Sequence, residues 1–162
     1  MTCLRASHFT NHQLTTFHSA GRGLGLNMAQ AFVEAGVTGL AIFDVQQEIG
    51  EKSARELAEQ TGIDVRFYKV DVRDSHAVQN AVNDVHSHYG KIDTLVSAAG
   101  IADSNIKAEN YDVEKFRRLL DINITGSFLV AQAIGRHMIH DKTGGSIFFI
   151  ASMSGSIVNY PQ

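Results

Sequence analysis

The amino-acid sequence predicts an α/β fold in which helices cover a parallel sheet. Three glycines alternate with other residues from Gly21 to Gly25, just ahead of a stretch with helical periodicity. Short apolar segments then alternate with longer amphipathic ones, a pattern typical of right-handed βαβ units. The length of 162 residues, the hydrophobic content of 44% and the net charge of -3 fit a single folded domain over residues 1–162.

Residues 1–17 fit this pattern least well. A central strand of a parallel sheet is covered on both faces, so it should be a continuous apolar run. Residues 13–18 hold that place, but only Thr15 to Phe17 favour a strand, and nearby histidines add polarity. We therefore expect the usual first strand to be replaced by sequence foreign to the fold, in an altered or incomplete version of a longer protein. A targeting peptide is the alternative, because the segment is basic and has no acidic residue.

The remaining elements follow in order from the glycine run. Helices are indicated by apolar stripes at helical spacing, and Gly36, Gly62 and Gly90 are natural stops for three of them. Asp74 is a candidate N-cap. The predicted helices are residues 24–35, Gln46–Thr61, 75–89 and Val113–His140, and the predicted strands after the first are Leu40–Asp44, Val65–Val70, Ile92–Val96 and Ser146–Ala151. The last helix is expected to bury Phe116, Leu120, Ile124, Phe128, Ala131, Ile134 and Met138.

The glycine run predicts a turn that binds phosphate. Glycine has no Cβ, so a pyrophosphate can approach the amides at the start of the following helix. A G-x-G-x-x-G turn from Gly21 would need glycine at position 26, and a P-loop would need Lys and then Ser or Thr after its last glycine. Leu26 and Asn27 exclude both. The predicted contacts are Gly21, Arg22, Gly23, Leu24 and Gly25, and a flexible loop is the alternative interpretation.

Acidic and small residues mark the carboxyl ends of three predicted strands. Asp44 lies 19 residues after Gly25, where a carboxylate can accept hydrogen bonds from both hydroxyls of an adenosine ribose and would repel a 2′-phosphate. Small residues let the chain pass close to a cofactor. An ordinary strand end or helix cap is the alternative at each position. The other candidate cofactor residues are Asp71, Val72, Ala98, Ala99 and Gly100.

Two polar residues in the second half of the chain are candidates for catalysis. Asn123 interrupts the apolar stripe of the helix 113–140, and a buried amide needs hydrogen-bond partners. Ser152 follows the last predicted strand, and its hydroxyl can both donate to and accept from a substrate carbonyl or hydroxyl. Ser154 competes with Ser152, and a structural role is the alternative for Asn123.

Taken together, these positions resemble the short-chain dehydrogenase/reductase family over about residues 19–162. Gly23 and Gly25 match the last two glycines of the family's T-G-x-x-x-G-x-G turn, although His18 and Ser19 replace its first two residues. Asp71-Val72 resembles the family's adenine-side Asp-Val pair, and Ser97-Ala98-Ala99-Gly100 resembles its N-A-A-G motif. Asn123 with Gly126 resembles the N-x-x-G segment. Ser152 with Gly155 resembles the catalytic S-x-x-G segment. Residues 21–30 and 154–162 further resemble the fungal sugar-alcohol dehydrogenase and ketose reductase branch.

The resemblance implies a Rossmann-type, doubly wound parallel sheet that is incomplete, with about five strands in the order 3-2-1-4-5. It implies hydride transfer between a nicotinamide and a polyol or ketose, with NAD favoured by Asp44. NADP is possible, because Arg22 stands where related NADP enzymes often carry a basic residue. Asn123 would support a water in the proton relay, and Ser152 would orient the substrate. The helix 113–140 corresponds to a subunit contact in the family, so a homo-oligomer is expected.

The family's proton donor is a tyrosine followed four residues later by a lysine that lowers the tyrosine's pKa. The sequence is interpreted as lacking such a pair, and Tyr160 as a substrate-loop tyrosine. We therefore expect impaired catalysis. A non-catalytic fragment that binds a dinucleotide or a partner is the alternative function.

Composition excludes several other classes of protein. The net charge argues against broad binding to nucleic acid or membranes, and no apolar run is long enough to span a bilayer. Cys3 is the only cysteine, which excludes an internal disulfide and suits a reducing compartment such as the cytoplasm. No metal is expected, because His86 and His88 would point to different faces of a helix. His137 and His140 lie near a helix end, where imidazoles more often contact carbonyls.

Overall fold

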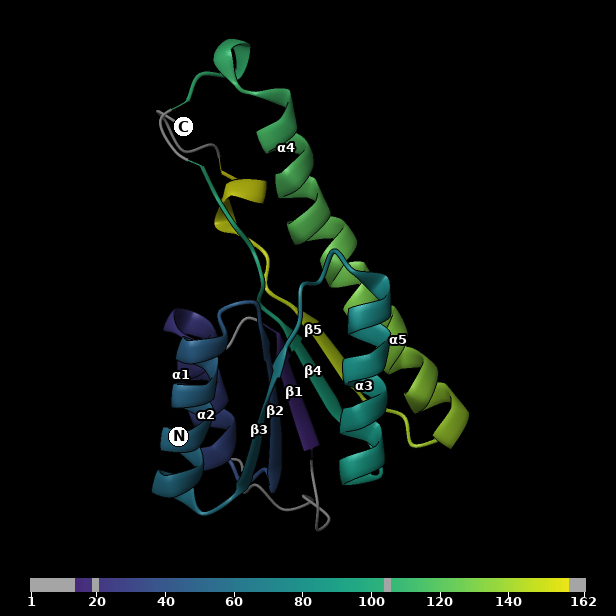
Figure 1. Cartoon of the computed structure of the whole chain (residues 1–162). Helices are drawn as coiled ribbons and strands as arrows, with labels where there is room; N and C mark the ends of the chain where they lie inside the picture. Colours follow the sequence, from purple (N-terminus) through teal and green to yellow (C-terminus); the bar gives the residue numbers. More distant parts are fainter. Residues whose placement is uncertain (1–13, 19–20, 104–105, 158–162) are drawn as a thin grey trace, which may run out of the picture.

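Five parallel strands form one sheet with helices on both faces (Figure 1). The computed structural model describes residues 14–18, 21–103 and 106–157. The sheet order β3-β2-β1-β4-β5 confirms the predicted fold class and strand order. The strands are β1 (Leu14–His18), β2 (Gly39–Asp44), β3 (Asp64–Lys69), β4 (Thr94–Ser97) and β5 (Ser146–Phe149).

β1 lies in the middle of the sheet, so residues 14–18 take the place of the usual first strand, as the predicted strand order requires. That this sequence is foreign to the fold stays a prediction. The strand pairs with β2 from Leu14 to His18 and with β4 from Thr15 onward, and residues 14–16 are buried. Pairing on both sides satisfies the backbone, and this tertiary context overrides the weak strand propensity. One poor fit remains, because the buried hydroxyl of Thr16 has no hydrogen-bond partner among the described residues. Residues 1–13 of the atypical segment lie outside those residues.

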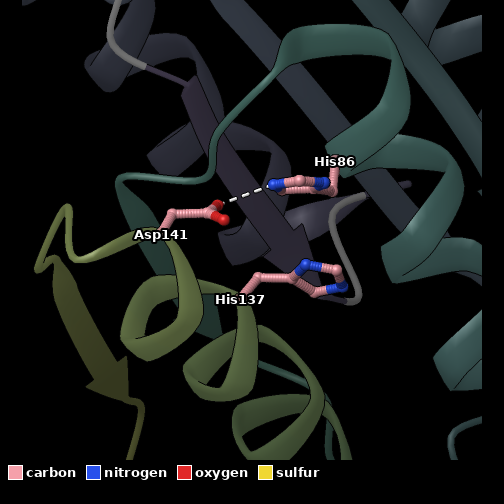
Figure 2. Close-up of side chains that lie close together, drawn as sticks. All are labelled: His86, His137 and Asp141. Atoms are coloured by element: carbon pink, nitrogen blue, oxygen red, sulfur yellow. Dashed lines mark hydrogen bonds and ion pairs between the residues drawn. The ribbon is translucent and has the colours of Figure 1, made fainter.

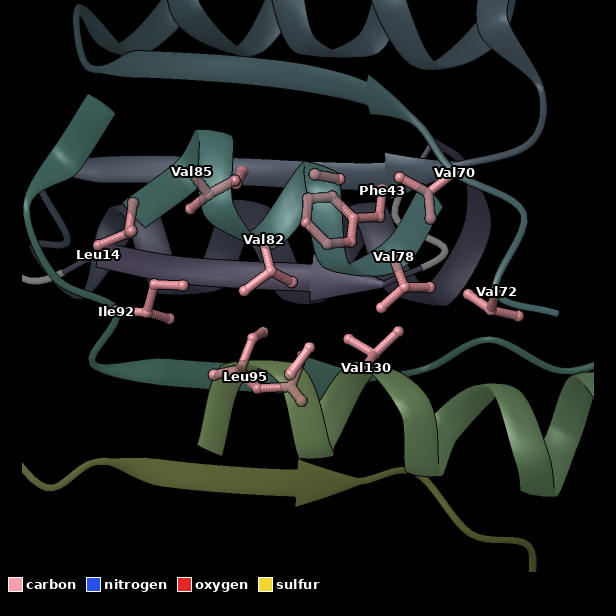
Figure 3. Packing of buried hydrophobic residues seen from close by; sticks show 14 of the residues in the cluster. Leu14, Phe43, Val70, Val72, Val78, Val82, Val85, Ile92, Leu95 and Val130 are labelled. Atoms are coloured by element: carbon pink, nitrogen blue, oxygen red, sulfur yellow. The ribbon is translucent and has the colours of Figure 1, made fainter. Parts of the chain in front are cut away.

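The helices divide the core into two clusters, one on each face of the sheet. α1 (Gly23–Glu34) and α2 (Gln47–Thr61) pack over Leu40, Ile42 and Val96. α3 (Ser75–Tyr89) and α5 (Ser127–Asp141) cover the opposite face, where the larger cluster lies (Figure 3). The larger cluster includes Leu14, Phe43, Val70, Val72, Val78, Val82, Val85, Ile92, Leu95 and Val130. Consecutive residues of β2 therefore enter different cores, as the alternation of side chains along a strand requires.

The predicted helix ends agree with the structure better than the predicted buried faces of the helices do. The Asp74 side chain caps α3 by accepting from the backbone N–H groups of His76 and Ala77, at 2.9 and 3.1 Å. α1 differs from its predicted stripe, because Leu24 is 64% exposed and the buried positions are Gly25 and Ala29. Among the described residues, no helix has both the length and the apolar character that crossing a membrane requires.

The predicted helix over residues 113–140 is continuous but irregular. It consists of α4 (Val113–Leu120), the π-helical segment η2 (Asp121–Gly126) and α5. Ile134 and Met138 are buried as predicted, but Phe116, Leu120, Ile124 and Phe128 are 39–64% exposed, contrary to the prediction. Phe116 and Leu120 belong to α4. Figure 1 shows that α4 extends beyond the sheet, so no strand lies beneath it.

Tyr89 links the end of α3 to the sheet by hydrogen bonds, and its ionisation makes the stability of the fold depend on pH in the alkaline range. Its hydroxyl donates to the carbonyl oxygens of Leu40 and Asp64, at 3.2 and 3.3 Å. Burial, with the nearby Asp64 carboxylate, holds the pKa of Tyr89 well above its usual 10.0. The unfolded chain therefore loses this proton more easily than the folded one, so stability is retained below about pH 10 and falls above it. Urea titrations between about pH 9 and pH 11 should show a smaller fall for Tyr89→Phe; an equal fall would contradict this.

Candidate functional site

Two adjoining pockets lie at the carboxyl ends of the strands, the edge where open α/β sheets bind ligands. The Asp44 pocket is lined by Arg22, Asp44, Val45, Gln46, Val70, Asp71, Val72, Arg73, Ala99, Gly100, Ile101, Arg118 and Ile122. The Ser152 pocket is lined by Ser97, Ala98, Ala99, Gly100, Asn123, Ile124, Ser127, Phe128, Phe149, Ile150, Ala151 and Ser152. Ala99 and Gly100 line both. The predicted catalytic residues Asn123 and Ser152 therefore lie beside seven of the predicted cofactor residues, whereas Gly21, Gly23, Leu24 and Gly25 line neither pocket. The seven are Arg22, Asp44, Asp71, Val72, Ala98, Ala99 and Gly100.

The glycine turn and Asp44 are in direct contact. The Gly21 N–H donates to Asp44 Oδ2 at 3.3 Å, and the Gln46 N–H donates to Asp44 Oδ1 at 3.0 Å. A Cβ at Gly21 would lie 3.0 Å from Asp44 Oδ2, so a side chain there would crowd the carboxylate. Gly23 has a φ of +58°, in the region that favours glycine. The turn and the acid therefore face one pocket; Leu24 is exposed and Gly25 is buried in α1.

Ser53 supports this turn and was not among the predicted residues. It lies on the inward face of α2, and its buried hydroxyl donates to the Gly21 carbonyl oxygen at 2.7 Å. The signal was a serine within the apolar face of an amphipathic helix, which needs a partner for the same reason that Asn123 does. The contact fixes the backbone of Gly21 between two helices, α1 and α2.

Basic side chains surround the acids of the Asp44 pocket. Arg73 donates from Nε to both carboxylate oxygens of Asp71, at 3.0 and 3.1 Å, and from Nη2 at 2.5 Å. These hydrogen bonds hold the pKa of Asp71 below its usual 3.8. With Arg22 and Arg118, three guanidinium groups line the pocket, and guanidinium suits bidentate contact with phosphate. Of these three arginines only Arg22 was predicted to line the site. Arg118 could not be placed from the sequence, because α4 reaches this pocket only in the folded chain.

Asn123 joins η2 to the loop that follows β4. Its Oδ1 accepts from the Ile101 N–H, and its Nδ2 donates to the Ile101 carbonyl oxygen, both at 2.9 Å. The side chain was predicted to be buried, but the structure shows it half-buried. Two hydrogen bonds to one residue fix the loop that carries Ala99 and Gly100.

Ser152 and Ser97 supply hydroxyl groups to the second pocket. Ser152 accepts from the Ser154 N–H at 3.1 Å and is exposed, and Ser154 is not one of the residues lining the pocket. Ser97 Oγ is buried without a hydrogen-bond partner among the described residues. Because buried polar atoms are normally satisfied, the Ser97 hydroxyl suits contact with a polar ligand.

The family described as short chain dehydrogenase matches residues 16–162. The chain belongs to the short-chain dehydrogenase family. The resemblance to its fungal polyol-dehydrogenase branch is also confirmed. The chain is 34% identical to the NADP-dependent mannitol dehydrogenase of Hypocrea jecorina over 150 residues, which cover 92% of this chain and 55% of that protein. It is 32% identical to a sorbose reductase of Candida albicans, over 86% of this chain and 49% of that protein.

A comparison with solved structures agrees with this result. The NAD⁺-bound xylitol dehydrogenase superposes with a TM-score of 0.84 at 33% identity, over 91% of this chain and 55% of that chain. This chain spans about half the length of the curated relatives it matches.

One pair with the spacing of the short-chain dehydrogenase Tyr-x-x-x-Lys motif does occur, at Tyr111 and Lys115, and was missed in the sequence. It precedes Ser152 and lies outside both pockets. The Tyr111 hydroxyl donates to Asp103 Oδ2 at 2.8 Å, and this hydrogen bond raises the pKa of Tyr111 above its usual 10.0. A proton donor needs the opposite shift. Tyr160, interpreted as a substrate-loop residue, lies outside the described residues.

His86, His88, His137 and His140 do not line these pockets, and one pairing among them was not predicted. His86 and His88 bind different partners, Asp141 and Asp64, in agreement with the expectation that they do not share a ligand. His86, however, lies beside His137 across the α3–α5 contact. Helical spacing had indicated a pairing of His137 with His140 alone.

Proposed function

We propose that this chain forms the dinucleotide-binding part of a polyol dehydrogenase, with hydride transfer between a nicotinamide and a polyol or ketose as the reaction. The observation that carries this proposal is the contact of the Gly21 amide with Asp44 beside the pocket of Asn123 and Ser152. The names mannitol dehydrogenase, sorbose reductase and xylitol dehydrogenase favour this class of substrate. The single cysteine agrees with a cytoplasmic setting.

The residues of the Asp44 pocket fit a dinucleotide, which supplies or accepts the hydride when bound. The glycine turn passes so close to Asp44 that a Cβ at Gly21 would crowd the carboxylate, and a turn without side chains leaves its backbone amides open to phosphate. Asp44 accepts two backbone hydrogen bonds and keeps further lone pairs for ribose hydroxyls. We assign NAD as the preferred form, because a 2′-phosphate would approach the Asp44 carboxylate. Arg22, Arg73 and Arg118 oppose this preference, so NADP is the competing assignment.

The remaining roles follow from position. Asn123 would hold the Ile101 loop and support a relay water, and Ser152 would orient the reacting carbonyl or hydroxyl. The exposed apolar side chains Phe116, Leu120, Ile124 and Phe128 suit a second copy of the chain packed along this helix.

Binding of reduced dinucleotide to the 162-residue chain tests the assignment. Titration calorimetry should show NADH binding at least about tenfold tighter than NADPH, a difference of about 1.4 kcal/mol. Asp44→Ser should remove most of this preference by removing the repulsive charge. Ser53→Ala is the matched control, because it loosens the same turn without touching the ribose position and should weaken both ligands alike. Equal affinities in the parent chain would contradict the NAD assignment, and no binding to the folded chain would overturn the proposed function.

A binding protein without turnover is the second candidate. The Tyr111–Lys115 pair, which has the spacing of the family motif, lines neither the Asp44 pocket nor the Ser152 pocket, and loss of a general acid typically costs a factor of about 10²–10⁴. Loss of NADH absorbance with a ketose separates the two candidates. Binding without turnover would support the second candidate, whereas turnover would exclude it.

A further inference from the structure

Two histidines and an aspartate meet where α3 packs against α5 (Figure 2). His86 Nε2 lies 2.6 Å from Asp141 Oδ2, and the rings of His86 and His137 stack with their centroids 4.3 Å apart. One potential ligand atom from each of the three residues lies within 4.8 Å of the other two. All three side chains are half-buried, so a solvent ion can reach them.

Neighbouring side chains set the protonation of His137. His137 Nε2 lies 2.9 Å from Asn83 Oδ1, which also accepts from Gln79 Nε2 at 3.0 Å. An amide oxygen only accepts, so Nε2 carries the proton and Nδ1 keeps the lone pair. The hydrogen bond to Asn83 therefore leaves Nδ1 of His137 as the ring's ligand atom.

Both carboxylate oxygens of Asp141 contact imidazole nitrogens. His140 Nδ1 contacts its Oδ1 at 2.9 Å, while Oδ2 faces His86. Asn83 and His140 thus orient the cluster as outer partners orient the ligands of known metal centres.

We propose that His86, His137 and Asp141 bind a single Zn²⁺ ion. Two imidazoles and one carboxylate form a zinc ligand set, whereas Mg²⁺ and Ca²⁺ prefer oxygen ligands alone. The ion takes the place of the hydrogen between His86 Nε2 and Asp141 Oδ2, one proton passes to water, and the bound His86 ring is neutral with its remaining proton on Nδ1. Water completes the four-coordinate shell.

Small side-chain movements accompany binding. Ligand atoms around tetrahedral zinc are about 3.4 Å apart, so the His86–Asp141 pair opens slightly and the third ligand atom moves in. Nearly parallel rings, inclined by 24°, cannot direct in-plane lone pairs at one ion, so one ring turns about its Cβ–Cγ bond. Half-exposed side chains on helix surfaces have room for this change.

The position of the ion indicates a structural role. His86 lies in the last turn of α3, and His137 and Asp141 lie near the end of α5, which places the cluster at the amino ends of β4 and β5. The two pockets lie at the opposite edge of the sheet. Bound zinc would therefore clamp α3 to α5 over the larger core and stabilise the fold.

Calorimetric titration of the metal-free 162-residue chain with zinc chloride tests the site. We expect one saturable ion, no binding of magnesium chloride, and an increase in Tm that EDTA reverses. His86→Gln and His137→Gln should each raise the Kd at least about tenfold, and Asn83→Ala, which removes an outer partner, by about 10- to 100-fold. His76→Gln is the matched control, because it removes a histidine from the exposed start of α3 and should leave the Kd unchanged.

Two results would overturn the proposal. One is the absence of saturable zinc binding to the folded parent chain, with circular dichroism confirming the fold. The other is an unchanged Kd in both His86→Gln and His137→Gln, which would place the ion on histidines elsewhere in the chain. Because Asn83→Ala keeps all three ligands, a loss of affinity in that variant without a loss of Tm in zinc-free buffer separates ligand orientation from a folding defect.

Discussion

Replacement of Phe43 by alanine is expected to lower the free energy of unfolding by about 3–5 kcal/mol. Phe43 in β2 is completely buried in the larger core (Figure 3). Its ring meets Tyr68 edge-on with centroids 5.5 Å apart. β2 is hydrogen-bonded to β1 and β3 on its two sides, so the sheet cannot close around the missing ring. The resulting cavity would lie immediately before Asp44, so dinucleotide affinity should fall as well.

Urea unfolding of Phe43→Ala and Val45→Ala measures this effect. The two residues flank Asp44, but Val45 is 52% exposed, and its truncation should change stability by less than about 0.5 kcal/mol. Similar losses for the two variants would mean that the cost comes from disturbing the strand end, not from the cavity.

Local signals in the sequence predicted the features that depend on nearby residues. Asp74 caps α3 because a short acidic side chain reaches the first free amides from the position before a helix. The strand-ending positions of Asp44 and Ala99 also followed, since parallel strands bring their carboxyl ends to one edge. These inferences needed only the alternation of elements and the spacing of motifs.

Features that depend on distant residues could not be predicted in the same way. Thr15 and Thr16 gave a weak strand signal, yet pairing with β2 and β4 holds them in the centre of the sheet. The stripe through Phe116 and Ile124 marked an apolar face but not what covers it. The His86–His137 contact depends on how α3 and α5 align, which periodicity within either helix does not specify.

Gly126→Ala should destabilise the fold by about 1–3 kcal/mol and weaken dinucleotide binding. A Cβ at Gly126 would lie 2.4 Å from Val72 Cγ2 and 2.9 Å from Val72 Cβ. Val72 is 4% exposed and lines the Asp44 pocket, so relief of the overlap must shift either η2 or the pocket wall. Urea unfolding and NADH titration of the same variant measure the two consequences.

Gly135→Ala, in the same continuous helix, is expected to stabilise the chain and is the control for Gly126→Ala. No described atom lies within 4 Å of a Cβ at Gly135, so alanine there should stabilise the chain by about 0.5–1 kcal/mol through its better helix propensity. If both alanines stabilise, the approach of η2 to Val72 is looser than the structure has it. If only Gly126→Ala destabilises the chain and also weakens NADH binding, the close contact of η2 with Val72 shapes the wall of the dinucleotide pocket. Both the fold and the site then require a small residue at position 126.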